Sequence, residues 1–217
     1  MKKILLFFII IFIFSCNKKE EKSTQLFEKN ETKNYFLIQN NNTNKTKNFI
    51  NKIEENPQNN NYYKMNIVKT KVVNYMMKEN TKLSKETAEK IFEIVKKISF
   101  EEKISPVFAL AIMNVESHFN HSIISSAGAI GIMQLMPSNE KEYGVNIYEL
   151  EQNIKGGIKH FKNDLKANNG NITLALAAYN SGQGKVNNNS WYQIKETRDY
   201  VFKVSNKINL ISSFFKI

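Results

Sequence analysis

The chain has 217 residues, of which 41% are hydrophobic, so it is long and apolar enough for one substantial domain with a real core plus appendages. Lys and Arg number 31 against 20 Asp and Glu, a net charge of +11 that would favour an anionic surface, although dispersed solvated lysines account for such an excess equally well. The single cysteine, Cys16, excludes an intramolecular disulfide.

The N-terminal sequence MKKILLFFIIIFIFSC has two lysines, an unbroken apolar run over residues 4–14, and then Ser15 and Cys16. This pattern predicts a signal peptide over residues 1–15, because the apolar run is too short to span a bilayer comfortably. The position of Cys16 resembles a bacterial lipobox, which predicts a lipidated Cys16 and an anchor in the membrane. The alternative is a secretory signal that is cut nearby without lipidation. An exported protein rarely meets nucleic acid, so we expect no such partner.

Residues 16–61 are rich in Asn, Lys, Glu and Thr and poor in apolar side chains, which predicts a flexible tether. Apolar side chains recur at roughly helical spacing between residues 62 and 77, so we expect an accessory helix within residues 62–83, with a strand as the alternative. Residues 84–217 then form the main domain.

The main domain is predicted to be mainly α-helical. Its first helix begins after Ser84, a good N-cap, and extends to about Ile98. Periodicity predicts further helices over residues 105–119, 148–167, 172–179 and 196–210. The glycine-containing stretch 128–136 predicts a small loop or β-hairpin element.

The helix expected over residues 105–119 carries the most informative residue of the chain. Ser105 is a good N-cap, Pro106 is a good first helical residue, and the following residues are almost all apolar. Glu116 comes in the last turn, where it loses hydration and lies near the negative end of the helix dipole. Both effects raise the pKa of a carboxyl group, as a general acid near neutral pH requires. The alternative is an ordinary solvated glutamate at a helix end.

Three further segments follow Glu116 in order: SSAGAIGIMQLMP (residues 125–137), ALAAYNSG (175–182) and ETRDYV (196–201). In this order and spacing they resemble the catalytic domain of soluble-type lytic transglycosylases, which cut bacterial peptidoglycan on a goose-lysozyme-like fold. The resemblance covers roughly residues 84–208. It implies a lysozyme-like helical domain with a small loop or hairpin element.

The resemblance also implies a reaction that needs only one protein carboxyl group. Residues 117–136 contain no second acidic side chain, and substrate-assisted glycosidases are known exceptions to the two-carboxylate rule. The substrate's own 2-acetamido group would attack the anomeric carbon while Glu116 protonates the leaving oxygen. Glu116 would then act as a base on the 6-hydroxyl of N-acetylmuramic acid, giving a 1,6-anhydro sugar.

Matching the motifs residue by residue implies a set of substrate-binding positions around the acid. Gly128 and Gly131 allow the backbone to approach a sugar closely. Tyr179 matches a tyrosine that hydrogen-bonds near the acid, and Asn180 begins the turn after that helix. The remaining matches are Ser125, which contacts the site, Met133 and Gln134, which line the cleft, and Glu196, a second family glutamate.

Each of these residues also has a purely structural interpretation. Tyr179 and Met133 could belong to the core, as aromatic and Met residues at helical spacing usually do. Glu196 could form a structural ion pair with Arg198. The histidines 118, 121 and 160 have no partner cysteines, so we expect no metal site and no cofactor. One departure from the family is His160-Phe161, where a Tyr-Leu pair is usual.

We therefore expect a lipid-anchored lytic transglycosylase that acts on peptidoglycan glycan strands as a monomer and faces the cell wall, in the periplasm or on the outer membrane if the envelope is Gram-negative. Two alternatives remain open. One is a muramidase of the same fold, in which water replaces the 6-hydroxyl group. The other is a non-catalytic peptidoglycan-binding lipoprotein.

Overall fold

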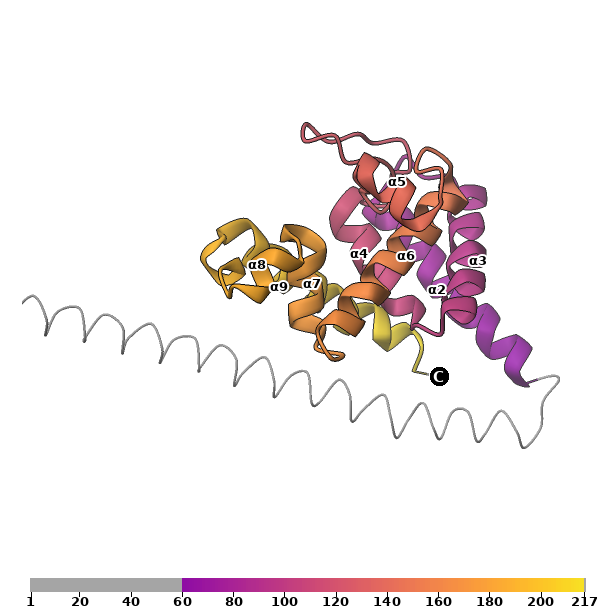
Figure 1. The fold of residues 1–217 in the computed structure, drawn as a ribbon. Coiled ribbons are helices and arrows are strands. Elements are labelled where there is room, and N and C mark those ends of the chain that lie inside the picture. Colours follow the sequence, from indigo (N-terminus) through magenta and orange to yellow (C-terminus); the bar gives the residue numbers. More distant parts are fainter. Residues whose placement is uncertain (1–59, 217) are drawn as a thin grey trace, which may run out of the picture. The chain divides into compact units, whose positions relative to one another are not determined.

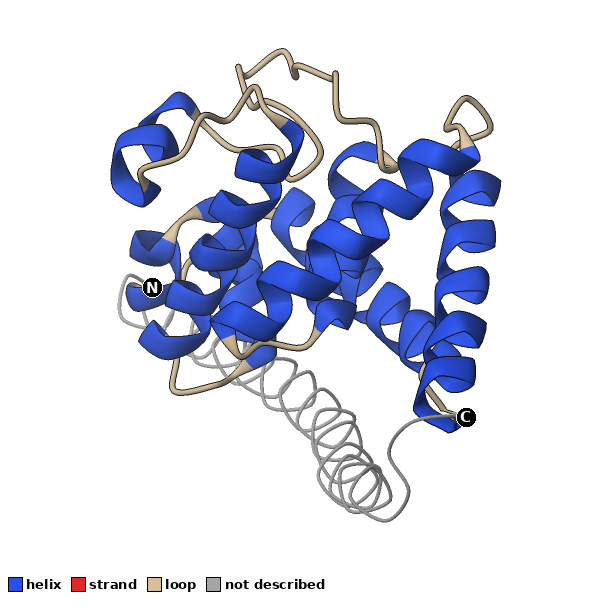
Figure 2. Cartoon of the chain, turned by 90° about the vertical axis from the view of Figure 1, so that its right-hand side faces the viewer, coloured by secondary structure: helices blue, strands red, loops and turns tan. Residues whose placement is uncertain are grey.

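The structure, a computed structural model, describes residues 60–216, and Asn56–Ile217 form one compact unit. The predicted signal peptide, Cys16 and nearly all of the tether lie outside the described residues. Within the described part every regular element is a helix (Figure 2). With the labels of Figure 1, these are α2 (Asn60–Glu79), α3 (Lys85–Glu102), α4 (Pro106–Ser117), α5 (Pro137–Tyr143), α6 (Leu150–Ala167), α7 (Ile172–Ser181), α8 (Gln183–Asn187), the 3-10 helix η1 (Trp191–Gln193) and α9 (Lys195–Phe214).

The prediction of a mainly α-helical, lysozyme-like domain is confirmed, and each helix expected from periodicity is present within a few residues of its expected bounds. Three short elements, α5, α8 and η1, were not predicted. The sequence of α5 is PSNEKEY and its only buried residue is Asn139, while α8 has no buried residue. Hydrophobic periodicity cannot detect such helices because they present no apolar face.

The loop or hairpin expected over residues 128–136 is a pair of tight turns between α4 and α5. Two isolated antiparallel bridges join Ile130 to Ile124 and to Leu135, and no continuous strand forms among the described residues. The Ile130 N–H donates to the Leu135 carbonyl at 2.8 Å, and the Leu135 N–H donates back at 3.0 Å. In Figure 1 this segment runs beside α5, on the side of the domain where α4 ends.

Helix α4 is the central helix of the domain and contacts α3, α6 and α9. The Ser105 hydroxyl accepts a hydrogen bond from the Val107 N–H at 3.3 Å, and Pro106 occupies the first helical position. Residues 109–114 are all almost completely buried, so α4 is apolar on nearly every side because neighbours cover nearly every side. This packing fixes the end of the helix that carries Glu116.

A polar contact ties α4 to the first and last helices of the described region. One carboxylate oxygen of Glu79, at the end of α2, accepts hydrogen bonds from Asn114 Nδ2 and Lys207 Nζ, each at 2.9 Å. Asn114 belongs to α4 and is 1% exposed, and Lys207 belongs to α9. Glu79 therefore satisfies a buried amide that would otherwise lack a partner.

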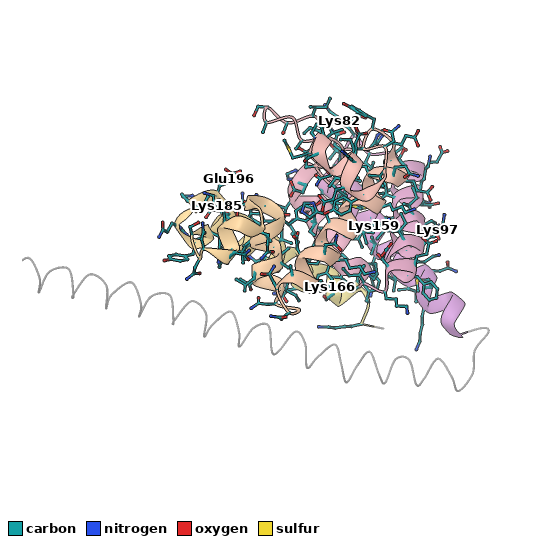
Figure 3. All side chains as sticks on the ribbon, in the orientation of Figure 1. Lys82, Lys97, Lys159, Lys166, Lys185 and Glu196 are labelled. Atoms are coloured by element: carbon teal, nitrogen blue, oxygen red, sulfur yellow. The ribbon has the colours of Figure 1, made fainter. Side chains whose placement is uncertain are left out.

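The lysines are distributed over many elements. Those labelled in Figure 3 lie on the turn after α2, on α3, on α6 and on α8. Several make ion pairs across helices, such as Lys97 with Glu151 at 3.0 Å and Lys162 with Glu102 at 2.7 Å. Among the residues that the structure describes, no helix is long and apolar enough to cross a membrane.

Candidate active site

Glu116 is the penultimate residue of α4, at a sharp exit of the chain from the helix. His118 and Phe119 follow with φ angles of 50° and 60°, so two consecutive residues adopt the left-handed conformation that few non-glycine residues adopt. The His118 N–H caps the Asn114 carbonyl at 3.1 Å. Phe119 is fully buried and packs edge-on against Tyr75, with ring centroids 6.1 Å apart. The buried ring holds the strained turn in place, and with it the position of Glu116.

The carboxyl group of Glu116 is held in a state suited to proton donation. Partial burial is the main cause that raises its pKa, to about 7, and the negative charge of Glu196 adds to the effect. The Tyr200 hydroxyl faces the carboxyl group and acts in the opposite direction, because a hydrogen bond to the carboxylate favours the ionised form. The predicted rise in the pKa of Glu116 is thus present, with desolvation as its largest cause.

Two tyrosine hydroxyl groups border Glu116. Burial, followed by the charge of Glu116, raises the pKa of both Tyr179 and Tyr200 far above the ordinary value, so both remain hydrogen-bond donors. Tyr179 on α7 donates to the Met133 carbonyl at 2.8 Å. Tyr200 on α9 is 6% exposed. Its hydroxyl group makes no hydrogen bond of ordinary geometry among residues 60–216, and it faces the Glu116 carboxyl group. A carboxyl group flanked in this way is restricted in orientation as well as in protonation.

Ser117 joins α4 to the turn that follows. Its hydroxyl lies 2.8 Å from the Ile132 carbonyl and 3.1 Å from the carbonyl of Met113, one turn earlier in α4. A hydroxyl group has one proton, so the shorter contact to Ile132 is the stronger one. Because Ser117 is the neighbour of Glu116, this bond places the turn directly beside the acid.

The side chain of Asn153, on α6, holds the same turn through hydrogen bonds to backbone groups. Its side-chain amide donates to the carbonyls of Ile130 at 2.9 Å and Ile147 at 2.7 Å, and its oxygen accepts the Met133 N–H at 2.9 Å. Gly131 makes this approach possible: its φ is 78°, and a Cβ atom would lie 2.4 Å from the Asn153 amide nitrogen. The predicted need for glycine at position 131 therefore has two physical causes in the structure, a left-handed backbone and a close side-chain contact.

The Met133 side chain lies in the core and not on a surface that a glycan could contact. It is fully buried, and it packs so closely on α6 that a Cβ atom at Gly157 would lie 2.5 Å from its methyl carbon. The expectation that this side chain lines a cleft is corrected accordingly. Met133 contributes its backbone instead, through the bonds to Asn153 and Tyr179.

The other predicted site residues lie on or near the turns. The Ser125 hydroxyl accepts the Ala129 N–H at 3.0 Å and closes the first turn. Gln134, with φ of 49°, donates its amide to the Gly131 carbonyl at 2.8 Å. Asn180 is partly exposed and lies within α7, which continues to Ser181, so it does not begin the turn as predicted.

Glu196 is exposed in the first turn of α9 and influences Glu116 through its charge (Figure 3). The alternative ion pair with Arg198 is not among those found in the described region, where Arg198 donates to the Tyr192 carbonyl. Within the same region no three His, Cys, Asp or Glu side chains gather closely enough to hold a metal ion.

Three residues of the site were not selected from the sequence. Tyr200 lies four residues after Glu196 in the motif ETRDYV, so helical spacing from Glu196 was the signal that could have found it. Ser117 directly follows the acid. Asn153 lies far along the chain, and no local pattern indicates that its amide would serve three backbone groups.

A helical domain with a central apolar helix, a protonatable carboxyl group at its end and a compact turn beside it belongs to the lysozyme-like class, as its structural neighbours show. The soluble lytic transglycosylase SLT70 from Escherichia coli aligns with a TM-score of 0.56 at 22% identity, over 69% of this chain and 30% of that one. The lytic transglycosylase Slt from Pseudomonas aeruginosa aligns with a TM-score of 0.51 at 25% identity, over 56% and 24%.

The Transglycosylase SLT domain family matches residues 93–202, and the chain belongs to this family. A transglycosylase of Enterobacteria phage PRD1 is 34% identical over 121 residues, which cover 55% of this chain and 43% of the relative. The membrane-bound lytic murein transglycosylase F of Pseudoalteromonas translucida is 43% identical over 79 residues, 33% of this chain and 17% of the relative. The chain spans less than half the length of these relatives.

Proposed function

We propose that the protein is a peptidoglycan lytic transglycosylase that cleaves the β-1,4 bond between N-acetylmuramic acid and N-acetylglucosamine, with Glu116 as its single general acid and base. The observation that carries the proposal is the Glu116 carboxyl group, whose pKa is raised to about 7 at the end of a buried helix, with the Tyr200 hydroxyl facing it and the buried Tyr179 within reach of its charge. A carboxyl group in this state is protonated in half or more of the molecules at and below neutral pH.

The reaction balances with the groups present. Glu116 gives its proton to the bridging oxygen as the bond from that oxygen to C1 of N-acetylmuramic acid breaks, and the acetamido oxygen of the same sugar bonds to C1. The Glu116 carboxylate then accepts the proton of the 6-hydroxyl group, whose oxygen bonds to C1 and displaces the acetamido oxygen. The products are a free N-acetylglucosamine 4-hydroxyl and a 1,6-anhydro end, and Glu116 is protonated again.

The relatives support this chemistry. Four of the similar proteins are called lytic murein transglycosylases, and the Pseudomonas aeruginosa structure is that of an inactive glutamate-to-glutamine mutant. In this chain the Tyr200 hydroxyl, which faces the carboxyl group, and the bond from Ser117 to the turn both serve the orientation of Glu116. That arrangement is what a reaction with a single protein carboxyl requires.

Digestion of purified sacculi tests the proposal. We expect the wild-type protein to release glycan ends that are lighter by one water than hydrolysed ends, as measured by mass spectrometry. Glu116→Gln should lower turnover by more than about 100-fold with an unchanged circular dichroism spectrum, whereas Glu149→Gln, at an exposed helix start, should remain active. Hydrolysed ends would identify a muramidase, and binding to sacculi without soluble products would identify a wall-binding protein; either result contradicts the proposal.

We further propose that the protein is exported and held at the membrane through a lipid on Cys16, facing the cell wall. Relatives that are called membrane-bound support this location. Metabolic labelling with a fatty-acid analogue should mark the wild-type protein and not Cys16→Ser. Equal labelling of both proteins, or of neither, would contradict the anchor.

A further inference from the structure

A second group of ionisable side chains lies behind Tyr179, away from the proposed acid. His160 and Asp164 are one turn apart on α6, and the histidine Nε2 lies 3.4 Å from the aspartate Oδ2. The His160 ring packs against the Tyr179 ring, with centroids 4.6 Å apart and an interplanar angle of 38°. The Tyr143 ring of α5 also lies near the imidazole, with the ring centroids 5.6 Å apart. The imidazole therefore contacts two phenol rings.

The histidine and the aspartate have few other partners. Asp164 is 8% exposed. Among residues 60–216, neither Asp164 Oδ2 nor the second histidine nitrogen, Nδ1, makes a hydrogen bond. A buried carboxyl group without donors is costly unless it carries a proton or faces a cation. His160 is the one side chain in ion-pair contact with it in the described part of the chain, so the two residues act as a unit.

We propose that His160 and Asp164 form a positioning pair for Tyr179, an inference that rests on the function proposed above. Asp164 holds the imidazole, and the face of the imidazole supports the Tyr179 ring. Tyr179 in turn holds the Met133 carbonyl at 2.8 Å and so fixes the turn beside Glu116. The pair does not touch the substrate; it acts on the reaction through the orientation of this tyrosine.

Because of its surroundings, the pair supports Tyr179 only while Asp164 carries a proton. Burial, followed by the charge of Glu142, raises the pKa of Asp164 to about 7, while burial lowers the pKa of His160 against the smaller effect of Glu142. The groups that face the pair are Glu142 and Tyr143 from α5, Tyr179 from α7 and, through the charge of Asp164, Tyr200 from α9.

With Asp164 protonated and His160 neutral, the pair holds one ionisable proton on the carboxyl group and is uncharged overall. Above about pH 7 that proton is lost and a buried carboxylate remains beside a neutral ring. Because an uncompensated buried charge is unfavourable, the support of Tyr179 weakens. Glu116 must also be protonated to act as an acid, so two ionisations should reduce activity on the alkaline side.

The experiment compares kcat and KM of the full-length protein on soluble glycan strands between about pH 5 and 9. His160→Ala should lower kcat about tenfold with little change in KM, because a small displacement of Tyr179 impairs the transition state more than binding. His160→Phe keeps a ring against Tyr179 and should restore most of kcat. In Asp164→Asn the alkaline decline of kcat/KM should follow a single ionisation, that of Glu116, while the wild-type decline is steeper. His121→Phe, at an exposed loop histidine, is the control and should leave kcat and the pH profile unchanged.

An unchanged kcat in His160→Ala, or a wild-type pH profile in Asp164→Asn, would contradict the positioning role of His160 and Asp164. A uniform loss at every pH that follows thermal stability would also overturn it, because that outcome indicates a merely structural role. NMR titration of the His160 imidazole does not depend on turnover. Asp164→Asn should change that titration whether or not the wild-type protein releases product. Absence of product would contradict the proposed function and not the pairing. An identical titration in both proteins would contradict the pairing itself.

Discussion

The hydroxyl group of Ser117 lies 2.8 Å from the backbone carbonyl of Ile132 and connects the end of the acid-bearing helix to the turn beside it. Both groups are buried, and the bond spans fifteen residues of sequence. The position of Glu116 relative to the turn therefore depends on a hydroxyl group on the adjacent residue. This relationship leads to a first prediction.

Ser117→Ala should destabilise the fold and reduce activity. The Ile132 carbonyl would lose its donor in a buried position, which costs about 1–2 kcal/mol of the free energy of unfolding. Urea denaturation measures the loss of stability, and sacculus digestion measures the loss of turnover. Ser126→Ala, in the exposed part of the same loop, should change neither; an equal effect of both substitutions would show that the bond from Ser117 has no special role.

Glu116→Gln should make the protein more stable at alkaline pH. The folded-state pKa of Glu116 is raised to about 7 from the usual 4.5, so folding opposes its ionisation. Below about pH 4.5 this carboxyl group does not lower the free energy of unfolding. As the pH rises from about 4.5 to about 7 the group lowers it progressively, and the loss is complete above that range. The glutamine variant should gain on the order of 2 kcal/mol at pH 8, since Glu116 keeps some contact with solvent, and nothing at pH 4. Thermal unfolding at both pH values measures the difference, and an equal gain at both would contradict the raised pKa.

Tyr200→Phe and Glu196→Gln should shift the pH dependence of activity in opposite directions. The Tyr200 hydroxyl lowers the pKa of Glu116, so its removal should move the alkaline limb of kcat/KM to higher pH. The charge of Glu196 raises that pKa, so its neutralisation should move the limb to lower pH, by a few tenths of a unit because the residue is exposed. Profiles of kcat/KM against pH, measured for both variants in the same buffers, test the two predicted directions. Shifts in the same direction would show that these residues do not act on Glu116 as described.

Gly131→Ala should be much more disruptive than Gly128→Ala. Both glycines have positive φ angles, 78° and 86°, so alanine is strained at either position by about 1–2 kcal/mol. Only at position 131 would the new Cβ also collide with Asn153, at 2.4 Å; at position 128 no atom lies within 4 Å. We expect a loss of more than about 3 kcal/mol for the first variant. Chemical denaturation compares them, and equal losses would mean that backbone strain alone explains the glycines.

Glu79→Ala should weaken the domain although residue 79 lies outside the matched family region. The substitution removes the acceptor of Asn114 and Lys207, and a buried amide left unpaired costs about 1–3 kcal/mol. Although burial opposes ionisation, the bonds from Asn114 and Lys207 hold the pKa of Glu79 below its usual value. Its contribution is therefore present above about pH 4.5 and is lost as the pH falls below that value. Denaturation should show a larger destabilisation at pH 7 than at pH 3, because a protonated Glu79 still accepts from Asn114 but no longer pairs with the Lys207 charge; Glu86→Ala, at an exposed position, is the control.

The helices could be predicted because each presents an apolar face or a clear cap. Ser84 and Ser105 each accept a hydrogen bond from the first turn of their helix, as their positions before apolar periodic sequences indicated. Glu116 could be found for a related reason, since a carboxyl group that ends an apolar helix is unusual in any sequence. Local patterns of this kind extend over a few helical turns at most.

The contacts that hold the turn beside Glu116 could not be predicted in the same way. Asn153 reaches the turn from twenty residues away, and the burial of Met133 depends on the absence of a side chain at Gly157 on another helix. Both relationships depend on how α6 packs against the turn, which no periodicity reports. The role of the Met133 side chain was misjudged because its neighbours in sequence, Ile132 and Gln134, do not show which face of the turn lies against α6.

Because the three hydrogen bonds of Asn153 go to backbone atoms, the path of the turn depends little on the side chains of the turn itself. Ile130, Met133 and Ile147 are held through backbone atoms by an amide that belongs to a different helix. Exposed positions such as Ser126 and Ala127 can therefore change during evolution without altering the path of the chain. The exposed part of the loop can thus vary in shape and charge while the carboxyl group of Glu116 keeps the same surroundings.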